Sequence, residues 1–404
     1  MVNWLYGPAG AGKTSIMRSL ASVLEQRGQF MGGFHFWRSD SSRNTLAHFI
    51  TTLAFQLAQN EPATLPLITQ ALTRDSLLLD KSTKTQMEKL IIEPLLACPA
   101  GESPKAVRCI LIDGLDECNE AGQREFLEKL LPTLISHLSS SPVKFFIASR
   151  QERVIDNLFS HPRLSNYTNR IFLEPSPEDV REFILAEFEE VNRCHPRLRV
   201  KHGGRWPRND QLDRLVEKSS GYFILCATAM RYINPPILHG RPPDQRLDDV
   251  LEAVSADPLR PLDALYLFIL RQHAPILPGL LDEWKRSIGL VCIPLDLPKL
   301  HPPTELSGRP EFAAELELWY GKEPSDLEEL LSGLGSILYF DKITGQPKIY
   351  HASFADFIFN RGRSQEFCID GARLHLEIAC AIVNSLVSDH PPNSTCHECL
   401  WIRR

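Results

Sequence analysis

The residue pattern with the most specific chemistry is a glycine-rich segment near the start, with the sequence Gly7-Pro8-Ala9-Gly10-Ala11-Gly12-Lys13-Thr14-Ser15. It follows an apolar run, Val2 to Tyr6, and opens a stretch with helical spacing of apolar residues. A loop between a strand and a helix directs backbone N–H groups and the positive end of the helix at phosphate oxygens. Lys13 adds a cation, and Thr14 offers a hydroxyl ligand to Mg²⁺. We therefore predict that residues 7–14 form a P-loop that binds a nucleoside triphosphate with magnesium, and that Ser15 also contacts the nucleotide.

A second group of candidate residues follows a buried apolar run that ends at Asp113. An acid at this point lies at the carboxyl edge of a parallel sheet, where open α/β folds bind their ligands. Asp113 is thus the candidate Walker B ligand for magnesium. Asp116 and Glu117 add an acidic pair, of which one can orient or deprotonate the attacking water. The sequence leaves open which of the two does so.

An arginine is the third candidate, because Arg150 follows another buried run, 143–149. Its guanidinium is expected at the same edge, where it can contact the γ-phosphate and sense its loss. The alternative is an ordinary ion pair with a carboxylate or a helix C-terminus. We predict catalytic roles for Asp116, Glu117 and Arg150.

The elements that must position these groups alternate between strand and helix over the first 175 residues, which predicts an α/β fold with a parallel sheet covered by helices on both faces. The expected strands are 2–6, 33–37, 107–113, 143–149 and a weaker 171–173. The first helix is expected over 13–27, with an apolar face made of Ile16, Leu20, Val23 and Leu24.

Helical periodicity then dominates from 178 to about 271, with an exposed connection expected over 193–210 and a Pro-rich loop over 294–310. Two short runs, 336–340 and 347–350, flank a turn at Thr344-Gly345 and predict a hairpin, which fits a small winged-helix domain. The predicted division is a nucleotide-binding domain over 1–175, a helical domain over 176–265, a winged-helix-like domain over 266–365, and a C-terminal helix and tail over 366–404.

Composition limits the partners. The 404 residues carry a formal net charge of -6, which gives no overall basic field, so nucleic acid is not an expected partner. No apolar run is long enough for a membrane helix, and no signal peptide is present, so no membrane association is expected. Ten cysteines at irregular spacings indicate reduced thiols and a cytoplasmic location. The Cys396-His397-Glu398-Cys399 segment is half of a zinc pattern without a second ligand pair, and we expect it to be an unliganded tail.

Together these motifs resemble a NACHT-type member of the STAND class of signal-transduction NTPases, in the fungal branch whose nucleotide domain is described as nephrocystin-3-like. The resemblance covers most of the chain. The segments that carry it are 4–14, 36–38, 43–44, 52–54, 113–117, 149–150, 221–224, 262–266 and 351–357.

The resemblance implies a regulatory switch with ATP or ADP and magnesium as its cofactors. ADP would bridge the P-loop domain and the winged helix, exchange for ATP would release that closure, and slow hydrolysis would reset it. The strand that ends at Arg150 would lie between the strands that carry the P-loop and Asp113. His351 would contact the β-phosphate of ADP. An unidentified trigger and self-oligomerisation of the active state are also implied.

The neighbourhood of His351 can be analysed from its residues as well. Ser353 and Asp356 have the spacing of a capping box, and Phe354 and Phe357 give the following helix an apolar face. His351 is therefore expected just before a helix N-terminus.

The sequence departs from the family pattern at Phe223, where relatives often carry a proline. The adenine-binding segment usually found upstream and the repeats usually found downstream are missing, so we expect a central module, a truncated gene model or a fragment. Two alternatives stay open, namely a P-loop ATPase or kinase whose purpose is turnover and a nucleotide-incompetent interaction module. The long helical continuation disfavours a compact kinase. The preference for ATP over GTP is not predicted.

Overall fold

The computed structural model describes residues 2–38, 40–97, 107–139, 141–235, 241–257, 259–293, 324–341 and 345–389. The chain forms two compact units. The first contains Met1–Asp179 and Ser220–Ile224, and the second contains Val180–Ser219 and Leu225–Arg404. The predicted Pro-rich loop over 294–310 and the Cys396 to Cys399 segment lie outside the described residues.

The first unit is built on a five-stranded parallel sheet with the strand order β2-β3-β4-β1-β5. The strands are β1 Val2–Tyr6, β2 Phe30–His35, β3 Arg108–Asp113, β4 Val143–Ser149 and β5 Thr168–Phe172. The α/β class and all five strands are thus confirmed. The bounds predicted for β2 and β5 were wrong by one to three residues. β2 ends at His35 because its last partner on β3 is Asp113, where β3 itself ends.

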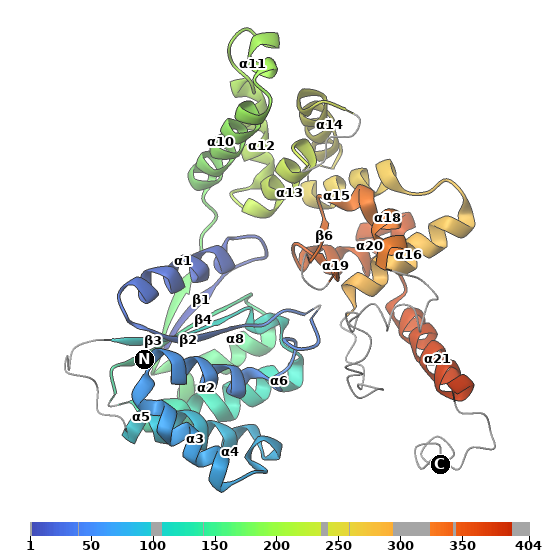
Figure 1. The fold of residues 1–404 in the computed structure, drawn as a ribbon. Coiled ribbons are helices and arrows are strands. Elements are labelled where there is room, and N and C mark those ends of the chain that lie inside the picture. The colour runs from blue at the N-terminus through green and yellow to red at the C-terminus, as the bar shows by residue number, and fades with distance from the viewer. Residues whose placement is uncertain are drawn as a thin grey trace. The chain divides into compact units, whose positions relative to one another are not determined.

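Helices cover both faces of this sheet, as predicted (Figure 1). α1, Lys13–Gln26, packs on one face against Leu5, Leu111 and Ala148. The other face carries the larger core, to which Trp4, Ile110 and Phe145 contribute from the strands. The helical segments in the rest of this unit are α2 Phe49–Asn60, α3 Leu65–Arg74, α4 Thr83–Met87, η3 Glu88–Ile92, α5 Glu93–Ala97, α6 Glu120–Glu125, η5 Phe126–Leu130, α7 Leu131–Leu138, α8 Arg153–Ser160 and α9 Pro162–Ser165, with single turns η1 Pro62–Thr64, η2 Leu78–Asp80 and η4 Leu115–Glu117.

The apolar face predicted for α1 is confirmed at Leu20 and Leu24 and wrong at Ile16 and Val23. Met17 and Leu24 are buried against the sheet, whereas Ile16 and Val23 are 41% and 42% exposed. The helix carries two overlapping apolar stripes, and the sequence alone does not say which one faces the sheet. The rotation of the helix about its axis is set by the loop that ends at Gly12, directly before α1.

The described residues of the second unit are helical apart from one hairpin. Its helices are α10 Pro177–Cys194, α11 Arg197–Lys201, α12 Asn209–Ser219, α13 Phe223–Ile233, α14 Pro243–Ala256, α15 Pro261–His273, α16 Pro278–Cys292, α18 Pro324–Leu331, α19 Ser353–Ile358, α20 Arg361–Ser364 and α21 Gly371–Asp389, with single turns η6 Ser332–Leu334 and η7 Gln365–Phe367. The first residues of α10 and α13 belong to the first unit.

The predicted hairpin is present, since β6, Leu338–Phe340, pairs antiparallel with β7, Pro347–Ile349. The segment 193–210, predicted to be an exposed connection, instead contains α11 and buries Leu198 and Trp206. The ring of Trp206 packs against that of Phe188, with 5.2 Å between the ring centroids. The finer division of the chain into a helical and a winged-helix-like domain stays a prediction.

Contacts between α15 and the α19–α20 region stabilise the second unit. Asp263 accepts two hydrogen bonds from Arg363, at 2.9 Å to Nε and 2.7 Å to Nη2. The ring of Tyr266 lies 5.2 Å from those of Phe354 and Phe357. The apolar face predicted for the helix after His351 is therefore confirmed.

Within the described part of the chain, no helix has both the length and the apolar character needed to cross a membrane.

Candidate functional site

The glycine-rich loop, residues 7–12, connects β1 to α1 in the first unit. Gly10 and Gly12 have φ angles of 76° and 90°, a left-handed conformation that glycine adopts at little cost. At Gly10 a Cβ atom would lie 2.1 Å from Cγ2 of Ile224, so no side chain fits there. These two glycines allow the tight curvature of the loop.

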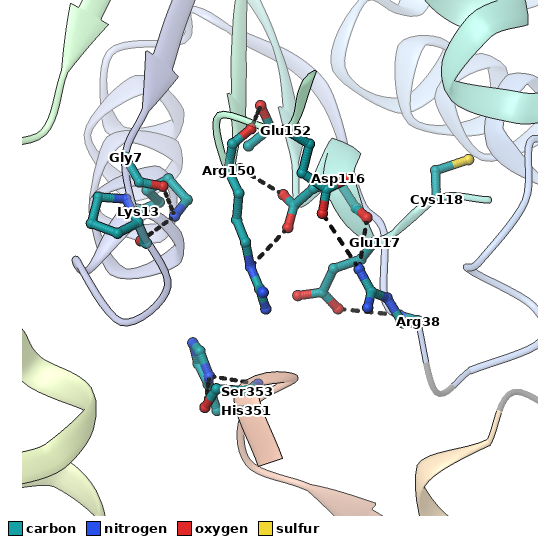
Figure 2. A network of polar contacts seen from close by, with 12 residues as sticks. Gly7, Lys13, Arg38, Asp116, Glu117, Cys118, Arg150, Glu152, His351 and Ser353 are labelled. Carbon is teal, nitrogen blue, oxygen red and sulfur yellow. Dashed lines mark hydrogen bonds and ion pairs between the residues drawn. The ribbon is translucent and has the colours of Figure 1, made fainter. Parts of the chain in front are cut away.

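Lys13, the first residue of α1, folds back over this loop (Figure 2). Its Nζ atom donates hydrogen bonds to the carbonyl oxygens of Gly7, at 2.9 Å, and Pro8, at 2.8 Å. Burial lowers the pKa of Lys13 from its usual value, and the neighbouring charge of Arg150 lowers it further, while Asp116, Asp113 and Glu117 oppose these effects. Its two hydrogen bonds in the described structure both go to neutral carbonyls. A partly buried cation in this position fits an anionic ligand.

The two predicted magnesium ligands come from neighbouring elements of the first unit. Thr14 is half-buried in the first turn of α1, next to the exposed Ser15. Asp113 is buried at the end of β3, where its Oδ2 atom lies 2.9 Å from Nδ1 of His35. Among the described residues no group of three or more His, Cys, Asp and Glu side chains is arranged to hold a metal. Magnesium is commonly bound through one or two protein ligands together with phosphate oxygens and water, and Thr14 and Asp113 fit that pattern.

The acidic turn after β3 holds Asp116, which is 3% exposed. Its Oδ1 accepts a hydrogen bond of 2.9 Å from the backbone N–H of Arg150, and its Oδ2 lies 3.1 Å from Nε of the same arginine. The ion pair considered as an alternative for Arg150 is therefore present. It holds the guanidinium at the carboxyl edge of β4.

Glu117 has a different environment, although it is the next residue. Its Oε2 accepts a hydrogen bond of 3.1 Å from the backbone N–H of Arg38. Burial raises the pKa of Glu117 above its usual value, and the nearby charge of Asp116 raises it further, against smaller opposite effects of the Arg38 N–H, His35 and Arg150. The raised pKa makes Glu117 a stronger general base than an ordinary glutamate.

Arg38 is a site residue to which the sequence prediction gave no role. Its Nη2 donates to the carbonyl oxygen of Asp116 at 3.1 Å and lies 3.8 Å from Oε1 of Glu152. The loop after β2 is thereby fastened to the acidic turn after β3. A signal was available in the sequence, because Arg38 follows the second predicted strand and so belongs at the same sheet edge as Asp113.

The segment Ser220–Ile224 also lies on the glycine-rich loop. The N–H of Phe223 donates to the carbonyl oxygen of Gly10 at 2.9 Å. A Cβ atom on Gly12 would lie 3.5 Å from the ring of Phe223, in ordinary contact. Phe223, at the position where relatives often carry proline, is thus a neighbour of the loop itself.

His351 belongs to the second unit, whereas the residues described above belong to the first. The predicted capping box is wrong, since Ala352 is the N-cap of α19 and makes no side-chain cap hydrogen bond. Ser353 is already the first helical residue, and its N–H donates to Nδ1 of His351 at 3.1 Å. The imidazole of His351 therefore caps the helix, which is the role that was predicted for Ser353.

In the sheet, β4 lies between β1 and β3, which confirms the strand order that the resemblance implied. β1, β3 and β4 are in register at their carboxyl ends, so the residues that follow them meet at one edge. The structure brings Lys13, Asp113, Asp116, Glu117 and Arg150 to this edge, close enough that the four other charges all act on the pKa of Lys13.

Comparison with known families agrees with the first part of this description. Residues 1–150 match the model of the family described as Nephrocystin 3, N-terminal, so this part of the chain is similar to a nephrocystin-3-like domain. A search of curated proteins found no match.

Proposed function

We propose that the chain is a nucleotide-dependent signalling switch of the NACHT/STAND type, which binds ATP or ADP with magnesium. In this proposal residues 1–175 form a P-loop NTPase domain, followed by a helical domain and a winged-helix domain. The observation that carries it is the environment of the Lys13 ammonium. This group is partly buried and, among the described residues, is hydrogen-bonded only to the carbonyls of Gly7 and Pro8. The carboxylates of Asp113, Asp116 and Glu117 lie close enough to act on its pKa.

Each residue of the site has a separate task. The backbone of residues 7–12, Lys13 and Ser15 would hold the phosphates, and Thr14 and Asp113 would hold magnesium, which neutralises charge on the phosphate oxygens when bound. Glu117 would take the proton of the attacking water. Asp116 would keep the Arg150 guanidinium in place to interact with the γ-phosphate.

As a switch, the chain would use the nucleotide to choose between a closed state with ADP and an open, self-associating state with ATP. His351 would hold the closed state by donating a hydrogen bond to a phosphate oxygen of ADP. Moving a two-state population from about 1:99 to 99:1 needs roughly 5.5 kcal/mol of differential binding, which a few charge-assisted hydrogen bonds provide. Hydrolysis then needs to be only fast enough to reset the switch.

Thermal unfolding of the purified full chain, with and without Mg·ADP, tests this proposal. A ligand at about 100 times its dissociation constant stabilises the native state by roughly 2.7 kcal/mol. We expect this stabilisation in the wild type and in Lys89→Ala, whose exposed lysine pairs with Glu93 away from the loop. Lys13→Ala should lose it.

Two results would contradict the switch. A wild type that ADP does not stabilise would favour the nucleotide-incompetent interaction module. A steady-state turnover of ATP that is fast without any trigger would favour an enzyme whose purpose is turnover.

A further inference from the structure

A chain of hydrogen bonds in the second unit ends on His351. Tyr266 of α15 places its hydroxyl 3.0 Å from Oγ of Ser353. That Oγ lies 2.8 Å from Nδ1 of His351, and the N–H of Ser353 donates to the same Nδ1 at 3.1 Å. Figure 2 shows the imidazole with Nδ1 turned toward Ser353.

These contacts determine which nitrogen of His351 carries the proton. A backbone N–H can only donate, so the Nδ1 atom that faces Ser353 must accept. A proton on Nδ1 would point at the hydrogen of the Ser353 N–H and be repelled by it. The neutral ring therefore carries its proton on Nε2. Because Nδ1 is an acceptor, the Ser353 hydroxyl donates to it and accepts in turn from Tyr266.

The residues behind the imidazole are buried. Tyr266 is 2% exposed and Ser353 is 4% exposed. Burial raises the pKa of Tyr266 to about 12, so the phenol keeps the proton that it donates. His351 itself is half-buried.

We propose that Tyr266 and Ser353 are positioning residues that hold His351 in its Nε2–H tautomer, so that the imidazole donates a hydrogen bond to a phosphate oxygen of a nucleoside diphosphate. This inference rests on the proposed function. A phosphate oxygen only accepts hydrogen bonds, so the Nε2–H tautomer attracts it, whereas the opposite tautomer would present a lone pair and repel it. The contacts with Tyr266 and Ser353 thus determine whether His351 attracts or repels a phosphate oxygen.

Two replacements of His351 separate its two nitrogens. The amide oxygen of His351→Asn lies near the position of Nδ1 and can still accept from the Ser353 N–H, but this side chain has no group near Nε2. The amide N–H₂ of His351→Gln reaches the position of Nε2 but does not cap the helix. The affinity for Mg·ADP and the midpoint of thermal unfolding are measured for both in the full chain.

We expect opposite results for the two variants. His351→Asn should keep its midpoint without ADP and bind ADP about 10-fold more weakly or worse. His351→Gln should lose roughly 2–4 °C of the midpoint and keep most of the affinity. Affinity that is retained by Asn and lost by Gln would overturn the inference.

The tautomer is measured without any nucleotide, by long-range ¹H–¹⁵N spectra of the full chain labelled in histidine. The His351 signals are assigned by their absence in His351→Gln. We expect a protonated Nε2 and an unprotonated Nδ1 at neutral pH, and a shifted Nδ1 resonance in Tyr266→Phe. Tyr232→Phe, which removes another buried phenol hydroxyl from the same unit, should leave the resonance unchanged.

The two measurements fail in different ways. A protonated Nδ1, or a resonance that does not respond to Tyr266→Phe, would contradict the role of Tyr266 and Ser353 in setting the tautomer. The proposed nucleotide switch would not be affected. An Nε2–H tautomer in a chain without affinity for ADP would overturn the proposed ligand and the proposed function together.

Discussion

Asp116 holds Arg150 through both oxygens of its carboxylate, one on the backbone N–H at 2.9 Å and one on Nε at 3.1 Å. Since both oxygens are engaged, Asp116 is poorly placed to receive a proton from water. In the proposed function the two neighbouring acids of the turn would therefore divide their tasks. Asp116 would position the arginine, and Glu117 would act as the base.

Removing Asp116 should cost stability as well as activity. In Asp116→Ala the backbone N–H of Arg150 and its Nε lose the carboxylate that they contact in a partly buried site. We expect the free energy of unfolding to fall by about 2–4 kcal/mol, measured by urea denaturation. Glu120→Ala is the control, because Glu120 pairs with Arg124 on the surface of α6. It should change stability by less than about 0.5 kcal/mol, and equal losses in the two variants would contradict the assigned role.

Glu117→Gln should retain ATP and slow its hydrolysis by about 100-fold or more, because the amide still accepts from the Arg38 N–H but takes no proton from water. Single-turnover measurements with Mg·ATP check this. Unchanged turnover would remove Glu117 from the role of base.

The raised pKa of Glu117 also predicts a pH dependence. Hydrolysis needs the ionised acid, so the acidic limb of the rate profile should lie above the ordinary pKa of a glutamate. The pH dependence of stability runs in the opposite direction to that of the hydrolysis rate. A folded-state pKa above the unfolded value favours folding at low pH, and this contribution is lost as pH rises through the folded-state pKa. Glu117→Gln should therefore be more stable than the wild type at neutral pH, and the difference should vanish in acid. A difference independent of pH would contradict this.

Gly10 should tolerate no side chain, for two separable reasons. Gly10→Ala forces an alanine into a left-handed conformation and against Ile224. Gly28→Ala is the matched control, since Gly28 has a φ of 63° and no neighbour within 4 Å of its missing Cβ. We expect Gly28→Ala to cost about 1 kcal/mol and Gly10→Ala about 2–4 kcal/mol in the free energy of unfolding. In the double variant Gly10→Ala/Ile224→Ala the new Cβ no longer meets the isoleucine, so the loss of unfolding free energy should be smaller than the sum of the two single losses. Losses that add up strictly would argue against the contact.

The sequence was sufficient for the sheet and for the edge where the charged residues meet. Apolar runs that end in Asp113 and Arg150 predict strand ends, and the carboxyl ends of parallel strands meet at one edge. The same reasoning did not separate Asp116 from Glu117, because their difference depends on which loop supplies a partner. The N–H of Arg38 that binds Glu117 is a backbone group, and every residue type except proline has one.

Ser353 illustrates a second limit. The S-x-x-D spacing predicted a cap, but α19 begins at Ser353 itself and His351 accepts from its N–H. Local patterns compete with tertiary contacts, and here the buried hydroxyl of Tyr266 engages the serine oxygen that the cap would have used.

The most direct test of the central claim is to identify and count the nucleotide that co-purifies with the full chain. We predict ADP at close to one molecule per chain in the wild type and almost none in Lys13→Ala, with both proteins folded by circular dichroism. A wild type that carries no nucleotide, or a folded Lys13→Ala that carries as much as the wild type, would contradict the account.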